Sequence, residues 1–275
     1  MPSMPYSFNS DGVEIAYLDE GEGEPIFLVH GFASNAGTNW VFPGWVKTLK
    51  EAGYRVIAHD NRGHGSSEKL YESEHYTSMI MAEDVRRLMD HLHVRSAYVM
   101  GYSMGARISA YLCLNHPERV KAAIFGGLAM GMVDGVPGSK EIGDALAADD
   151  PSTITDPQAI AFRTFADQTK SDRLALAACI RESRSQISAE QISSISQPVL
   201  VAVGTTDDVA GDVNQFASLL PNAEVCDIPN RITCWRLVIR YISKGLWNSY
   251  HGKFNLEGLL FPLFAQYHLW IHQPI

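Results

Sequence analysis

The alternation of short apolar runs with helical patterns constrains the fold of this chain more than any other feature of its sequence. Short, mostly apolar runs occupy residues 26–29, 55–58, 97–100, 122–125 and 198–203; the second begins with Arg55 and continues with three apolar residues. Between two of these runs, residues 81–92 place their apolar side chains on one helical face. Strands that are buried on both faces and joined by helices form a parallel sheet. The sequence therefore predicts an α/β fold, with a mostly parallel sheet and helices on both of its faces.

An unusually long connection separates the last two predicted strands. It has about 70 residues, which is longer than an ordinary crossover, and it becomes helical in pattern from Ala159 onward. We therefore expect residues 131–194 to form a small helical cap on a core made of residues 1–130 and 195–230. Residues 231–275 are set apart as a tail of atypical composition.

Composition narrows the classes of partner. The formal charge of −9 leaves no basic field for nucleic acid or for an anionic membrane surface, so neither is expected as a partner. No signal-peptide pattern and no apolar run long enough to span a bilayer is present, and a cytoplasmic location is expected. The four cysteines lack the close spacing of a metal or redox motif and are predicted to be buried small residues: Cys113, Cys179, Cys226 and Cys234.

The pentapeptide GYSMG at residues 101–105 is the main chemical motif. It lies between a predicted strand and a helix predicted from Met104 to Leu114, which is the context that the pattern G-x-S-x-G requires. The two glycines make room for a tight turn, and the helix N-terminus offers positive potential to a developing oxyanion. Ser103 is therefore predicted to be a nucleophile; the alternative is an idle serine in a glycine-bracketed turn.

Two further segments supply the groups that such a serine needs. HGF at residues 30–32 follows a buried strand, so the amides of Phe32 and Met104 are expected to form an oxyanion hole. His30 is expected to be a structural residue that hydrogen-bonds the loop. Asp207 follows the strand at 198–203 and is expected to orient a histidine, while an ordinary turn residue is the alternative.

Asp208 and Asp60 are expected to have roles outside catalysis. Asp208 is expected to face solvent or to cap its loop. Asp60 lies in the loop DNRGHGSS and is expected to pair with Arg62 and fix that loop rather than to act in catalysis.

The chain resembles the α/β-hydrolase superfamily, specifically its small serine esterase-like members, in four segments that occur in the same order: HGF, D-x-RGxGxS, GYSMG and G-x-x-D. The resemblance extends from about Phe8 to Pro229. The resemblance implies that Ser103 attacks an acyl carbon, that a histidine held by Asp207 takes its proton, and that water cleaves the acyl-enzyme. A serine at this position argues against the haloalkane dehalogenase and epoxide hydrolase branches. The resemblance implies neither an organic cofactor nor a metal ion.

The resemblance fails after the segment AEVCDIP, where such enzymes carry the catalytic histidine. The histidine is expected near Thr233, and residues 232–275 hold one acidic residue against four basic ones. If one base is restored before the codon of Ile232, permitted codons regroup to DHMLAVGD, although Asn or Tyr could equally replace the histidine. We therefore hypothesise a single-base deletion near Ile232. The histidines left in the tail are weak candidates for the missing base: His251, His268 and His272.

The sequence thus predicts a serine hydrolase that acts on a small ester, lactone or related acyl compound. Without its histidine the enzyme is expected to be nearly inactive, because loss of the triad histidine costs about 10⁶ in kcat in subtilisin. The alternative is a non-catalytic protein that keeps the pocket for a ligand or a partner. Tight ligand binding without turnover would favour that alternative.

Overall fold

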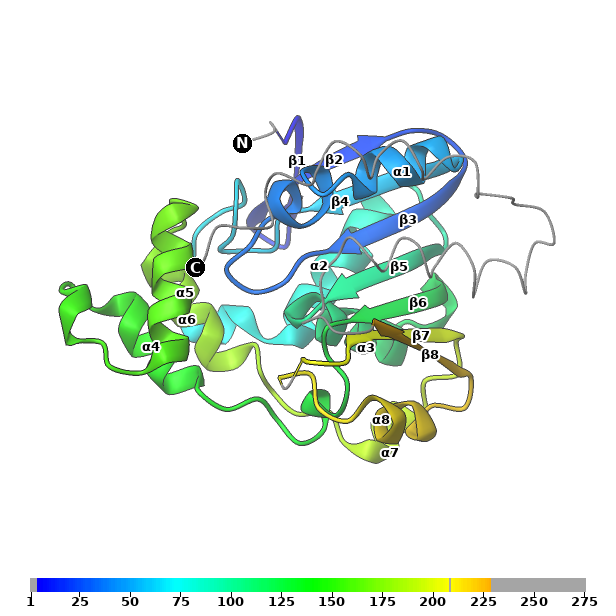
Figure 1. Ribbon diagram of the computed structural model, residues 1–275. Helices are drawn as coiled ribbons and strands as arrows, with labels where there is room; N and C mark the ends of the chain where they lie inside the picture. The colour runs from blue at the N-terminus through cyan, green and yellow to red at the C-terminus, as the bar shows by residue number, and fades with distance from the viewer. Residues whose placement is uncertain (1–3, 208, 229–275) are drawn as a thin grey trace, which may run out of the picture. The chain divides into compact units, whose positions relative to one another are not determined.

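The computed structural model describes residues 4–207 and 209–228. Within this part of the chain, eight strands form one sheet in the order β1-β2-β4-β3-β5-β6-β7-β8 (Figure 1). The pairs β1–β2 and β2–β4 are antiparallel, and all the others are parallel. The strands are β1 (Tyr6–Ser10), β2 (Val13–Glu20), β3 (Glu24–Val29), β4 (Tyr54–His59), β5 (Ala97–Tyr102), β6 (Val120–Gly126), β7 (Val199–Gly204) and β8 (Ala223–Ile228). The predicted α/β fold is confirmed.

Helices connect the strands. The α-helices are α1 (Trp45–Glu51), α2 (Ser78–His91), α3 (Met104–Asn115), α4 (Ser139–Ala147), α5 (Pro157–Gln168), α6 (Arg173–Glu182), α7 (Ala189–Ser193) and α8 (Val213–Leu219). Shorter turns are the π-helix η1 (Gly37–Val41) and the 3₁₀ helices η2 (Ser73–Tyr76), η3 (Pro117–Arg119), η4 (Met130–Met132) and η5 (Pro151–Thr153). In the described part of the chain, none of the helices combines the length and the apolar composition needed to cross a bilayer.

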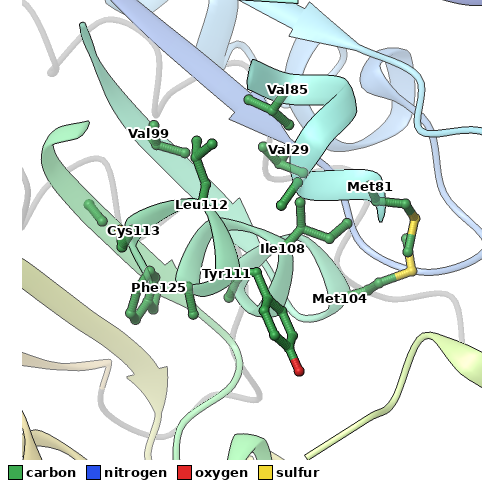
Figure 2. Close-up of a cluster of buried hydrophobic side chains, with 14 of the residues drawn as sticks. Val29, Met81, Val85, Val99, Met104, Ile108, Tyr111, Leu112, Cys113 and Phe125 are labelled. Atoms are coloured by element: carbon green, nitrogen blue, oxygen red, sulfur yellow. The ribbon is translucent and has the colours of Figure 1, made fainter. Parts of the chain in front are cut away.

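Both faces of the central strand β3 are buried. Phe27 and Val29 belong to one large core cluster together with side chains of α2 and α3, several of which Figure 2 shows. Ile26 and Leu28 alternate with them, so they point to the opposite face, where they are equally buried. This double burial explains why β3 is a continuous apolar run rather than an alternating one.

The connection between β6 and β7 contains the three helices α4, α5 and α6, which Figure 1 shows gathered beside one end of the sheet. They share a hydrophobic cluster that includes Ile142, Leu146, Leu176 and Ile180. Asp156 begins α5 by accepting a hydrogen bond from the amide of Ala159 at 2.7 Å. The division of the chain into a core, a cap at residues 131–194 and a tail from residue 231 stays a prediction.

Two elements differ from the sequence-based expectation. The helices between β6 and β7 begin with α4, about 20 residues before Ala159, although that stretch is rich in glycine and aspartate. Gly138 adopts a left-handed conformation just before α4, and this glycine ends the preceding loop rather than breaking a helix. Strand β1 was also not predicted. It is a short edge strand in which only Phe8 and Ser10 are buried.

Candidate active site

Ser103 lies at the turn between β5 and α3, as the sequence predicted. Its backbone has φ 49° and ψ −112°, a conformation that residues other than glycine rarely adopt. The amide of Ser103 donates to the carbonyl oxygen of Gly126 at 2.8 Å, which fixes the turn against the neighbouring strand β6. The side chain is half-buried at the N-terminus of α3, where the helix dipole favours negative charge. This position suits a group that carries or stabilises a developing oxyanion.

The two glycines of the pentapeptide allow α3 to pack directly on the sheet. A Cβ atom on Gly105 would lie 2.0 Å from the carbonyl oxygen of Val29, and one on Gly101 would lie 2.1 Å from that of Gly105. Both contacts are with backbone atoms, so neither can be relieved by a side-chain rotation. The crowding that the motif implied is therefore present on both sides of Ser103.

The segment HGF lies beside this turn. Strands β3 and β5 are parallel neighbours with Val29 opposite Gly101, so the residues that follow them meet at the same edge of the sheet. A Cβ atom on Gly31 would lie 2.9 Å from the ring of Tyr102, which shows how closely the two loops approach. The amides of Phe32 and Met104 have no hydrogen-bond partner among the described residues. Both donors are thus available for a ligand, and their role in an oxyanion hole stays a prediction.

His30 connects the loops that follow β3 and β4. Its Nδ1 donates to the carbonyl oxygen of Gly31 at 2.8 Å, and its Nε2 accepts from the amide of Asn61 at 2.9 Å. Burial lowers the pKa of His30 to about 3, so the ring is neutral near neutral pH. Both ring nitrogens are therefore engaged with the backbone, as expected for a structural histidine.

The loop after β4 corrects one prediction. Arg62 does not pair with Asp60; its guanidinium forms two hydrogen bonds with Asp84 of α2, both at 2.7 Å and both buried. Asp60 instead accepts from the amides of Ala36 and Ser66, at 2.8 and 2.7 Å. Asp60 thus fixes the loop through backbone amides, whereas the arginine ties that loop to α2.

The loop after β4 also contains a buried histidine, His64, for which the sequence predicted no role. The Nδ1 of His64 donates to the carbonyl oxygen of Arg62 at 2.9 Å, while its Nε2 has no partner among the described residues. Burial lowers the pKa of His64 to about 3. Its ring contacts those of His30 and Phe32, with centroids at 5.2 and 5.9 Å. His64 therefore supports the loop that carries the Phe32 amide.

Asp207 follows β7 by three residues, and its side chain is half-buried. Strands β5, β6 and β7 are consecutive in the sheet, so the loops that carry Ser103 and Asp207 lie at the same edge of the sheet, with the end of β6 between them. One carboxylate oxygen of Asp207 accepts from the amide of Val209 at 3.3 Å, which is an Asx turn. The turn expected as the alternative role is therefore present, and the catalytic role of Asp207 stays a prediction. Asp208 lies outside the described residues.

The histidines of the described chain do not complete a triad. No hydrogen bond joins any of them to Ser103 or Asp207 within residues 4–207 and 209–228. The expected position near Thr233 and the hypothesised change near Ile232 lie outside the described residues, as do the tail candidates His251, His268 and His272. Within the same limits, no group of three or more histidine, cysteine, aspartate or glutamate residues could hold a metal ion.

Side chains from the connection between β6 and β7 contact the side chains of Phe32 and Met104, the two residues whose amides are the predicted oxyanion donors. The ring of Phe162 in α5 contacts that of Phe32, with centroids 5.5 Å apart. The sulfur of Cys179 in α6 lies 3.9 Å from that of Met104, and Figure 2 shows Met81 of α2 beside the same methionine. These contacts join residues far apart in the sequence, so no local pattern could have found them.

Comparison with known proteins identifies the fold. Residues 24–137 match the family described as the alpha/beta hydrolase fold. The solved structure described as "Est816 as an N-Acyl homoserine lactone degrading enzyme" superimposes with a TM-score of 0.70 and 28% identity, covering 90% of this chain and all of that one. The chain is an α/β-hydrolase-fold protein. The esterase EaEST from Exiguobacterium antarcticum, 21% identical with a TM-score of 0.67, covers 85% of this chain and 93% of its own and shares the fold.

Relatives matched by sequence cover a shorter stretch of this α/β-hydrolase-fold chain. Non-heme chloroperoxidase CPO-A1 from Kitasatospora aureofaciens is 35% identical over 122 residues, which are 44% of this chain and 42% of that protein. Epoxide hydrolase 3 from Siraitia grosvenorii is 29% identical over 121 residues, which are 43% of this chain and 36% of that protein. The chain therefore spans about two fifths of the length of the relatives it matches.

Proposed function

We propose that the chain is a serine hydrolase of small esters, lactones or related acyl compounds. The observation that carries the proposal is the strained turn at Ser103, with φ 49° at the N-terminus of α3 and the amides of Phe32 and Met104 beside it. A non-glycine residue held in such a conformation requires surrounding structure that over-determines it, and such strain is concentrated at functional sites. A structural turn at this point could use glycine without strain.

The chemistry follows from these groups. The Oγ of Ser103 attacks the acyl carbon, a histidine held by Asp207 takes the hydroxyl proton, and the carbonyl oxygen becomes an oxyanion held by the amides of Phe32 and Met104. Collapse of this intermediate expels the alcohol, which receives the proton from the histidine. Water then attacks the acyl-enzyme in the same way and releases the acid and the free serine.

The substrate class rests on a limited similarity. Est816, which is 28% identical and is described as degrading an N-acyl homoserine lactone, supports an ester or lactone as substrate. Similarity to an epoxide hydrolase covers only part of the chain, and Ser103 stands at the turn where the aspartate of that branch would be expected. We therefore favour acyl transfer over epoxide opening.

We further propose that the chain is impaired as it stands because the histidine expected near Thr233 is missing from its sequence. A threonine hydroxyl does not act as a general base near neutral pH. The rival function is a non-catalytic binding protein, for which the same loops would hold a ligand without turnover.

Labelling with a fluorophosphonate probe tests both parts of this proposal, because the probe reacts with an activated serine whatever the natural substrate is. Intact mass is measured for this chain, for a version carrying DHMLAVGD after Arg231, and for Ser103→Ala in each background. We expect the restored version alone to label, and only through Ser103. If the unrestored chain labels quickly, a tail histidine completes the triad and the impairment is wrong. If neither version labels while ligand binding persists, the binding protein is the better description.

A further inference from the structure

Arg107 is a buried cation in the helix that begins at the predicted nucleophile. Its side chain is 1% exposed, and its guanidinium donates to the carbonyl oxygens of Gly131, Met132 and Ser185 at 3.0, 3.0 and 2.7 Å. No carboxylate pairs with Arg107 among the described residues. Burial lowers the pKa of Arg107 to about 10, so the group stays charged near neutral pH. Three backbone dipoles therefore take the place of a counter-ion.

The three carbonyls lie on either side of helices α4, α5 and α6, a part of the β6–β7 connection that is called the helical insertion below. Gly131 and Met132 lie in η4, where the chain leaves β6 toward α4, and Ser185 lies where it returns from α6. The two ends also contact each other, because the amide of Ile187 donates to the carbonyl oxygen of Met132 at 3.0 Å. Arg107 thus ties both ends of the helical insertion to α3.

The same segment supports the loop of Asp207. The amides of Ala129 and Gly131 both donate to the carbonyl oxygen of Ala210, at 2.8 and 3.0 Å. Gly211 has a φ of +78°, and a Cβ atom on it would lie 2.6 Å from the amide nitrogen of Gly131. The loop after β7 is therefore packed on the very residues that Arg107 holds.

Arg107 also lies one helical turn after Ser103, since its amide donates to the carbonyl oxygen of Ser103 at 3.2 Å. We propose that Arg107 is a positioning residue that fixes the loop of Asp207, and both ends of the helical insertion, relative to Ser103. This inference rests on the proposed function for its catalytic meaning, but the physical coupling between the loops can be tested without activity.

The planar guanidinium explains why this position needs arginine. One terminal nitrogen serves Met132 and Ser185 while the other serves Gly131, so carbonyls on two separate segments are held by one rigid group. The ammonium of a lysine is a single point with a different geometry and does not span the same three acceptors. A methionine removes all three hydrogen bonds and the charge.

Hydrogen exchange with residue-level mass spectrometry tests the coupling in the full chain. Arg107→Met is expected to raise exchange at the amides of Ala129 and Gly131, which donate to Ala210, by about tenfold or more. The matched control is Arg163→Met. Arg163 is also buried and donates to two backbone carbonyls, but these belong to α4 and the residue that follows it. The control is expected to leave exchange at Ala129 and Gly131 unchanged.

Arg107→Lys is a second variant for the same measurement if Arg107→Met does not fold, because lysine keeps the positive charge but lacks the planar guanidinium. It is expected to raise the same exchange. Unchanged exchange at Ala129 and Gly131 in the folded Arg107 variants would overturn the proposal, and so would an equal increase in Arg163→Met.

The catalytic consequence is measured by fluorophosphonate labelling in the DHMLAVGD-restored background. There the Arg107 variants are expected to lower the maximal labelling rate about tenfold without changing the probe concentration for half-maximal rate. A change in half-saturation alone would contradict positioning. Failure of every background to label would reject the proposed function while leaving the exchange result to decide the coupling.

Discussion

Acid should destabilise this protein through three buried histidines, His30, His59 and His64, because burial lowers the pKa of each. His30 and His64 each have a pKa lowered to about 3 by burial, whereas a histidine in the unfolded chain titrates near 6.5. Because the folded pKa is the lower one, the unfolded chain binds more protons as pH falls from 6.5 toward 3. The free energy of unfolding therefore decreases over that range.

The expected loss is large. Between about pH 7 and about pH 5, each histidine with these two pKa values lowers the free energy of unfolding by about 2 kcal/mol, so His30 and His64 together lower it by about 4 kcal/mol. His59 changes it in the same direction. This loss is a large fraction of the roughly 5–15 kcal/mol that holds a typical domain folded. Since the rings of His30 and His64 adjoin the loop of Phe32, the same protonation is expected to open one side of the candidate site.

Urea unfolding followed by tryptophan fluorescence at the two pH values measures this loss. In His64→Asn, whose amide can still donate to the carbonyl oxygen of Arg62, the loss is expected to fall by about 2 kcal/mol. His93→Asn is the control, because His93 is exposed and has a φ of 55° that asparagine tolerates. If His64→Asn loses as much stability as the parent chain, the reasoning from burial is wrong.

Three further perturbations follow from the described contacts. Gly105→Ala places a Cβ atom 2.0 Å from the carbonyl oxygen of Val29 and is expected to cost about 3 kcal/mol or more in urea unfolding; a loss under about 1 kcal/mol would contradict the close packing of α3. Asp84→Asn leaves the buried Arg62 without its counter-ion and is expected to cost about 3 kcal/mol, whereas an unchanged urea midpoint would mean that the pair contributes nothing. Burial raises the pKa of the Cys179 thiol to about 12, so iodoacetamide is expected to modify it only after unfolding; peptide mapping that finds it modified in the native protein would refute this.

The sequence predicted the sheet well because its central strands are buried on both faces. The apolar run at residues 26–29 is visible without any partner, and it became β3. Strand β1 is half-exposed and only five residues long, so its pattern is too weak to detect. Helix α4 was missed because its glycines suggested a loop; Gly138 lies just outside the helix, whereas Gly143 lies inside it and is buried.

In the candidate site, too, the sequence predicted local features correctly and missed contacts between distant residues. Ser103 and Phe32 were located by local motifs whose spacing fixes the backbone. The partner of Arg62 was predicted wrongly, because Asp84 lies on a helix 22 residues away while Asp60 is a near neighbour in sequence. The carbonyls that Arg107 binds are equally far from it in the sequence. Because every residue has a backbone carbonyl, the residue type does not show which one accepts the hydrogen bond. Contacts that only the fold creates could therefore not be predicted.

Because the two ends of the helical insertion lie close together, the insertion can be replaced by another segment. The carbonyl oxygen of Met132 and the amide nitrogen of Ile187 lie 3.0 Å apart, so the chain leaves the core and returns to it at nearly the same point. Closing a longer or shorter segment between such fixed points costs little, because loop entropy grows only slowly with length. We therefore expect segments of other lengths to be tolerated between these two residues, provided that a backbone carbonyl still meets Arg107 where that of Ser185 does. Laboratory recombination of this scaffold has a natural pair of crossover points there.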